Sequence, residues 1–141
     1  MGNAHAYVAD TIEKTDVLLK DIERALDMPK ERRNLSYKAL RAVLHALRDR
    51  LSVDESAQLA AQLPTLVRGI YYEGWQPGQV PVRMSLDEWL QQVREECPID
   101  VEGGTPRLVR SVLFALRRHV TPGEWDDVRA SLPDEYSPMI P

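Results

Sequence analysis

The chain has 141 residues, with 18 basic and 22 acidic side chains that give a net charge of -4 at pH 7. This length suits one ordinary domain, and the acidic balance argues against a nucleic-acid binder, because such proteins carry a basic excess. The single cysteine excludes an internal disulfide and a zinc site built on several thiolates. No apolar run reaches the ~18–20 residues of a membrane span, so we expect a cytoplasmic protein that is not membrane-bound.

The first three predicted helices lie within residues 15–64. In the middle one, apolar residues recur at i, i+3, i+4, i+7 and i+11 from Leu40, which is the spacing of one helical face. Ser52 followed by Glu55 has the spacing of a capping box, so the third helix is expected to begin there. Pro64 is expected to end it, because the residue before a proline disfavours helical dihedrals.

An aromatic segment follows over residues 65–84, with one short helix, TLVRGIYY, predicted at its start. Tyr71, Tyr72 and Trp75 crowd together there among glycines and prolines. Loops longer than about 12 residues are uncommon in compact domains, and tyrosine and tryptophan dominate binding hot spots. The segment is therefore a candidate surface for docking a protein or peptide partner. The alternative is a linker between two halves of the molecule, with Trp75 plugging the seam.

The last three predicted helices, within residues 85–133, repeat the first three. The string VRSVLFALRRHV from Val109 matches LRAVLHALRDRL from Leu40, and the match continues without a gap to the Leu-Pro pair that ends each copy. Such a fixed offset indicates an internal repeat. Because three short helices bury little alone, the two units are expected to pack about a pseudo-twofold axis. We predict one all-α domain over residues 1–141, made of two tandem three-helix repeats joined by the aromatic linker.

A pair of arginines, seven residues apart, recurs in both copies of the repeat. Because the guanidinium fork suits phosphate and carboxylate, one interpretation is a binding site for an anion or small molecule. The other, which we favour, is a structural ion pair, since an acidic residue recurs together with the arginines. The residues concerned are Arg41, Arg48 and Glu55 in the first copy and Arg110, Arg117 and Glu124 in the second.

The histidines and the cysteine do not form a catalytic or metal-binding pattern. His45 is replaced by Phe114 in the second copy, and a position that accepts phenylalanine predicts a packing role for the histidine. The sequence has no His-x-x-x-His spacing, no glycine-rich phosphate loop and no nucleophile motif. Cys97 follows two glutamates, which disfavour a thiolate. We expect no metal, no cofactor and no catalytic residue.

The string LRAVLHALRDRLSVDESAQLAAQLP, followed by RGIYYEGW, resembles a bacterial family of domains of unknown function, numbered twenty-two sixty-seven. The resemblance covers residues 16–136 and implies an all-helical, duplicated fold in a small soluble protein. It implies no reaction and no cofactor. We expect a non-catalytic module that binds a protein or peptide. The alternatives are an anion or small-molecule binder, and a weak nucleic-acid contact through the short basic run KERRN, which begins at position 30.

Overall fold

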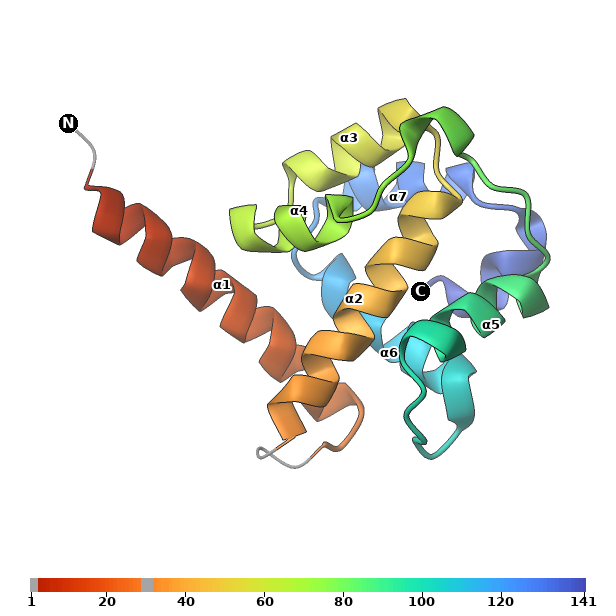
Figure 1. Ribbon diagram of the computed structural model, residues 1–141, viewed down its shortest axis with the longest axis horizontal. Helices are drawn as coiled ribbons and strands as arrows, with labels where there is room; N and C mark the ends of the chain where they lie inside the picture. Colours follow the sequence, from red (N-terminus) through yellow and green to blue (C-terminus); the bar gives the residue numbers. More distant parts are fainter. Residues whose placement is uncertain (1–2, 29–31) are drawn as a thin grey trace.

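The computed structural model describes residues 3–28 and 32–141, and every regular element in these ranges is a helix (Figure 1). The prediction of an all-α fold is therefore confirmed. The helices, in chain order, are α1 (Ala4–Ala25), α2 (Arg33–Asp49), α3 (Val53–Ala61), α4 (Thr65–Tyr72), α5 (Leu86–Glu96), α6 (Gly104–Arg117) and α7 (Pro122–Ser131), with the short 3-10 turns η2 (Pro77–Gln79) and η3 (Asp134–Met139).

Capping side chains mark where three of the helices begin, and the sequence predicts the one at Ser52. The Ser52 hydroxyl accepts a hydrogen bond from the Glu55 N–H in the first turn of α3, and the Thr121 hydroxyl accepts one from the Glu124 N–H in the first turn of α7. At α5 the capping box is complete, because the Ser85 hydroxyl accepts from the Glu88 N–H at 3.1 Å while the Glu88 carboxylate accepts from the Ser85 N–H at 3.0 Å. These boundaries are therefore explained by interactions within the first turn of each helix.

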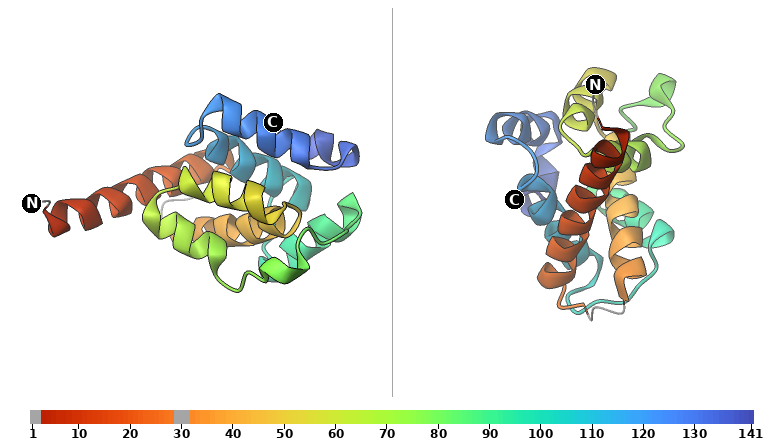
Figure 2. Two further views of the ribbon diagram at one scale, coloured as in Figure 1. Left: turned by 90° about the horizontal axis from the view of Figure 1, so that it is seen from above. Right: turned by 90° about the vertical axis from the view of Figure 1, so that its left-hand side faces the viewer.

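Two central helices, α2 and α6, lie at the centre of the core. They pack against each other, while α1 and α5 each pack against both of them and α3 packs against α7 (Figures 1 and 2). Full burial of one leucine or valine side chain contributes about 1.5–3 kcal/mol to stability. Because the apolar faces of α2 and α6 bury each other, each helix stabilises the other. The two matching sets of buried residues are Leu40, Val43, Leu44 and Leu47 on α2, and Val109, Val112, Leu113 and Leu116 on α6.

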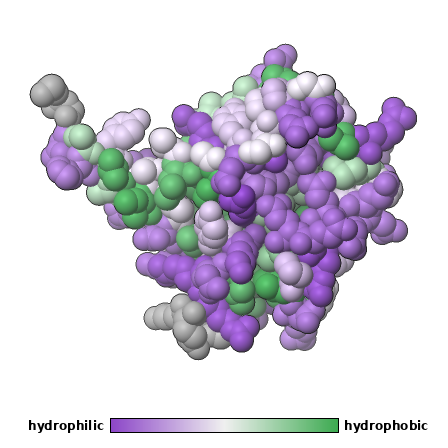
Figure 3. Space-filling model, viewed as in Figure 1, coloured by the Kyte–Doolittle hydropathy of each residue, from purple (hydrophilic) through white to green (hydrophobic). Residues whose placement is uncertain are grey.

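The helix α1 has two different halves. From Thr15 onward its apolar face is buried against the core, through Leu18 and Ile22 among others. The first half extends away from the body of the molecule (Figures 1 and 2) and exposes apolar side chains such as Val8 and Ile12. Figure 3 shows the resulting hydrophobic band along this half of the helix.

The predicted linker over residues 65–84 is only partly a linker. Its first part is α4, which packs on α2, α3 and α1. The chain then crosses to α5 past the end of α2, where the Val82 N–H donates to the Asp49 carbonyl at 2.6 Å and the Arg50 guanidinium donates to the Val82 carbonyl at 2.7 Å. The C-terminal end of α4 lies against α2, where the two helices form a polar site.

Candidate functional site

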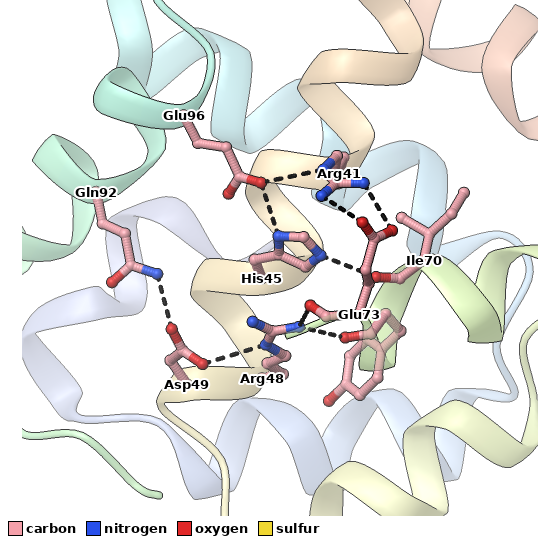
Figure 4. A network of polar contacts seen from close by, with 9 residues as sticks. Arg41, His45, Arg48, Asp49, Ile70, Glu73, Gln92 and Glu96 are labelled. Carbon is pink, nitrogen blue, oxygen red and sulfur yellow. Dashed lines mark hydrogen bonds and ion pairs between the residues drawn. The ribbon is translucent and has the colours of Figure 1, made fainter. Parts of the chain in front are cut away.

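One face of α2 holds the C-terminal end of α4. Arg41, His45 and Arg48, spaced at i, i+4 and i+7, all point toward this end (Figure 4). Arg48 is buried and donates to the carbonyl oxygens of Tyr71 at 2.9 Å and Glu73 at 2.5 Å. The last four carbonyls of a helix have no partner within the helix, so the Arg48 guanidinium acts as a cap for α4.

Arg41 and His45 complete the contact through two glutamates. The Arg41 guanidinium donates to both carboxylate oxygens of Glu73 at 2.7 Å, and this hydrogen bonding lowers the pKa of Glu73. The two ring nitrogens of His45 face the Glu96 carboxylate at 2.7 Å and the Ile70 carbonyl at 2.8 Å. A carbonyl oxygen cannot donate, so Nε2 carries a proton and donates to Ile70.

The same network also reaches α5, so it joins three helices. Arg48 contacts the Asp49 carboxylate at 3.2 Å, and the Gln92 amide donates to the other oxygen of Asp49 at 2.9 Å. Glu96 of α5 lies 3.4 Å from the Arg41 guanidinium. Each of these charged groups has a partner within the network. The site therefore stabilises the packing of α4 and α5 on α2, and both ring nitrogens of its histidine are occupied.

The aromatic segment singled out in the sequence packs against this site. Tyr71 is fully buried, and its hydroxyl donates to the Ser56 hydroxyl at 3.0 Å. Tyr72 and Trp75 are half-buried, and their ring centroids lie 5.1 Å apart. The side chain of Tyr71 consequently belongs to the core, and only the other two rings reach the surface.

The matching face of α6 is open. Arg110, Phe114 and Arg117 have the same spacing as Arg41, His45 and Arg48, but all three side chains are exposed, with 53% of the Phe114 surface accessible. The guanidinium groups of Arg110 and Arg117 make no hydrogen bond or ion pair with any residue in the part of the chain that the structure describes.

The interior position predicted for His45 from its replacement by phenylalanine is confirmed, but not for the reason given. The His45 ring is held by two hydrogen bonds, whereas the phenylalanine at the matching position lies on the surface. The physical reason is that α4 covers the first position and no described segment covers the second. A substitution between copies of a repeat reports on burial only where the same neighbours surround both positions.

The two repeated glutamates face each other instead of the arginines, which corrects the ion pairs expected from the sequence. Glu55 on α3 and Glu124 on α7 lie next to each other, and each has one buried carboxylate oxygen without a hydrogen-bond partner among the described residues. Burial and the neighbouring Glu55 carboxyl raise the pKa of Glu124 to about 8. The neutral form of Glu124 is favoured there, because a buried charge on it would be poorly solvated and would repel the charge on Glu55.

Residues 15–139 match the family described as Uncharacterized conserved protein (DUF2267). The chain belongs to this family. The DUF2267 match begins at Thr15, where α1 enters the core, so it includes both central helices but not the projecting half of α1. No curated protein matches the chain.

Three further observations on this DUF2267 chain concern metal ligands, membrane spans and the cysteine. Within residues 3–28 and 32–141, no group of three His, Cys, Asp or Glu side chains could hold a metal ion. In the same described ranges, no helix is long and apolar enough to cross a membrane. Burial raises the pKa of Cys97, which disfavours the reactive thiolate. The first two positions of the basic run KERRN lie outside the described residues.

Proposed function

We propose that this DUF2267 chain is a non-catalytic protein-interaction module that binds its partner on the exposed face of α6. The observation that carries the proposal is the exposure of Phe114 between Arg110 and Arg117, on a helix whose opposite face lies in the core. Aromatic and arginine side chains contribute most of the binding energy in protein interfaces. We call these three residues the α6 face.

We also propose that residues 15–64 and 85–133 are repeat units related by a pseudo-twofold axis, with residues 65–84 between them. The placement of the first helix of each unit supports this proposal, because α1 and α5 each pack on both central helices. Side-chain contacts between the two units follow the same pattern. In one half Gln92 contacts Asp49 at 2.9 Å, and in the other Asp21 lies 3.8 Å from Arg118 at the matching position.

This arrangement explains why only one arginine face is open. The segment after α3 forms α4, which lies on α2 and delivers Glu73 to Arg41. The segment after α7 forms η3 and continues to Pro141, whose carbonyl accepts a hydrogen bond of 2.7 Å from Trp125 of α7. The α6 face is therefore left without the cover that its counterpart has.

A second candidate function is the binding of a small anion by Arg110 and Arg117. The specific observation in its favour is that neither guanidinium has a carboxylate partner among the described residues. Arginine binds phosphate and carboxylate equally well in geometric terms, so the charge alone does not separate this function from the first. Phe114 separates them, because an exposed aromatic ring adds nothing to the binding of a small hydrophilic anion.

Photo-cross-linking from position 114 tests the proposed function. The Phe114 side chain is replaced by benzoylphenylalanine in cells that naturally make the protein, and the same group at Val53, an exposed position on α3, is the control. We expect one discrete protein adduct from position 114 that disappears when Arg110 and Arg117 are both changed to Glu. The absence of an adduct, or the same adduct from Val53, would refute the proposal.

A further inference from the structure

The covered face of α2 shows what kind of segment the repeated arginines hold. Arg41 binds the Glu73 carboxylate through two hydrogen bonds of 2.7 Å, and Arg48 donates to the carbonyls of Tyr71 and Glu73. These groups form the C-terminal end of α4, which also carries the negative pole of the helix dipole. The ligand of this face is therefore a helix end that terminates in a carboxylate.

The α6 face has two arginines at the matching positions, but it lacks counterparts of the two carboxylates, Glu73 and Glu96, that contact Arg41. When α1 is aligned with α5 in the repeat, Glu96 falls on Ala25, which carries no charge. The segment after α7 leads to Pro141, whose carbonyl is bound by an indole N–H of α7. No described residue consequently brings a carboxylate to Arg110 or Arg117.

The charges around the α6 face suit an acidic ligand. Two further arginines flank it, Arg107 on α6 and Arg118 directly after the helix. Their ion pairs are long, 3.5 Å from Arg107 to Asp27 and 3.8 Å from Arg118 to Asp21. Four arginines on or directly after α6 are thus paired with only these two aspartates among the described residues, in a chain whose net charge is -4. This local positive excess attracts an acidic partner and repels a basic one.

Phe114 sets a further requirement on the ligand. At the matching position His45 donates to the Ile70 carbonyl, which a phenylalanine ring cannot do. The Phe114 ring offers apolar surface instead, with 53% of it accessible. A ligand that matches both the apolar ring and the positive charge beside it places an apolar side chain on Phe114 and a carboxylate on the neighbouring arginines.

We infer that the α6 face binds the C-terminal end of a partner helix in which an aromatic or aliphatic side chain is followed by a carboxylate. This inference rests on the proposed function of the same face. It names the occupant by analogy with α4, whose end reads Ile70-Tyr71-Tyr72-Glu73 and lies on the matching face of α2.

A titration with a synthetic helical peptide tests the inference. The peptide has an alanine-based helix of about 12–15 residues, long enough to be partly helical in water, that ends in Ile-Tyr-Tyr-Glu with an amidated terminus. A second peptide ends in Gln instead of Glu. Fluorescence anisotropy measures binding to the full chain and to its Arg110→Ala, Arg117→Ala and Phe114→Ala variants. The matched control is Arg83→Ala, which removes an exposed arginine elsewhere in the chain.

We expect the Glu peptide to bind about tenfold more tightly than the Gln peptide, because the Gln peptide lacks one charge-assisted hydrogen bond. Arg110→Ala, Arg117→Ala and Phe114→Ala should each weaken binding by a similar factor, and Arg83→Ala should change it less than about twofold. Equal affinity for both peptides, or equal loss in Arg83→Ala, would overturn the inference. A third result would also overturn the inference: millimolar sulfate displaces the peptide, and the Phe114→Ala variant binds the peptide as tightly as the wild type. A small anion would then be the ligand.

Other outcomes separate the inference from the proposed function. If the peptide does not bind at about 1 mM while position 114 still gives its cross-linked adduct, the face docks a protein by another chemistry and only the inference fails. If neither occurs, both fail. A dimer that is lost in Arg117→Ala would also overturn the inference, because a second copy of the chain would then cover the face.

Discussion

The central helices α2 and α6 carry the same pattern of core residues but present different outer faces. Arg48 on α2 is 6% exposed and bonded to the end of α4, whereas Arg117 at the matching position on α6 is exposed. The cores agree because each helix buries its apolar stripe against the other. The outer faces differ because a later segment covers one of them. The same short pattern therefore gives a structural contact in one place and an open surface in the other.

The largest difference in stability is expected between the variants Arg48→Ala and Arg117→Ala. Arg48→Ala leaves the carbonyls of Tyr71 and Glu73 and the Asp49 carboxylate without their buried donor. We expect a loss of roughly 3–5 kcal/mol in the free energy of unfolding, against less than about 0.5 kcal/mol for Arg117→Ala. Urea denaturation followed by circular dichroism measures both. Equal losses would mean that the two faces are not different in the way described.

Exchanging His45 and Phe114, which lie between the two arginines of each helix, should give a smaller difference in the free energy of unfolding. His45→Phe removes the donor to the Ile70 carbonyl and leaves Glu96 without its ring partner, so we expect a loss of roughly 1–3 kcal/mol. Phe114→His changes an exposed side chain and should alter stability by less than about 0.5 kcal/mol. The same denaturation curves test this. A His45→Phe variant as stable as the wild type would show that the two hydrogen bonds of His45 do not help to hold α4.

The pairing of Glu55 with Glu124 predicts a pH dependence of stability. The pKa of Glu124 is about 8 in the folded chain and near its ordinary value of 4.5 when unfolded. Between these values the folded chain keeps a proton that the unfolded chain has released, so the free energy of unfolding falls as pH rises. Glu124→Gln keeps a donor for Glu55 without titrating, and should be the more stable form at pH 9 by roughly 1–2 kcal/mol.

Thermal unfolding of both forms from pH 5 to pH 9 measures this difference. The curves should diverge as the pH rises, since the wild-type chain alone loses stability through this carboxyl pair. Parallel curves over the whole range would show that Glu124 ionises normally in the fold. Arg83→Ala, which changes one charge far from the pair in sequence, should keep the wild-type slope.

Local patterns in the sequence were enough to place the helices. The spacing from Leu40 predicted α2, Ser52 with Glu55 predicted the start of α3, and the family resemblance was confirmed. The first two signals depend on residues that are close together in the sequence. That is why they could be read without knowing how the helices pack.

The partners of the charged residues could not be predicted in the same way. Arg41 meets Glu73 only because α4 ends beside α2, and Glu96 reaches it from the opposite side. One signal was available for Glu55 and Glu124. In the proposed twofold arrangement, a position close to the axis lies opposite its own copy, so a repeated glutamate there would meet a glutamate. Burial and the neighbouring carboxyl then raise the pKa of Glu124.

The central claim is that equivalent arginines are bonded on α2 and available to a partner on α6. Nuclear magnetic resonance of the arginine side-chain N–H groups tests it most directly, with the Ile-Tyr-Tyr-Glu peptide added to the labelled chain. We predict that the Arg48 signal, protected from exchange in the free chain, stays in place, and that the Arg110 and Arg117 signals shift and become protected. Shifts at Arg48 with unchanged signals at Arg117 would contradict the account.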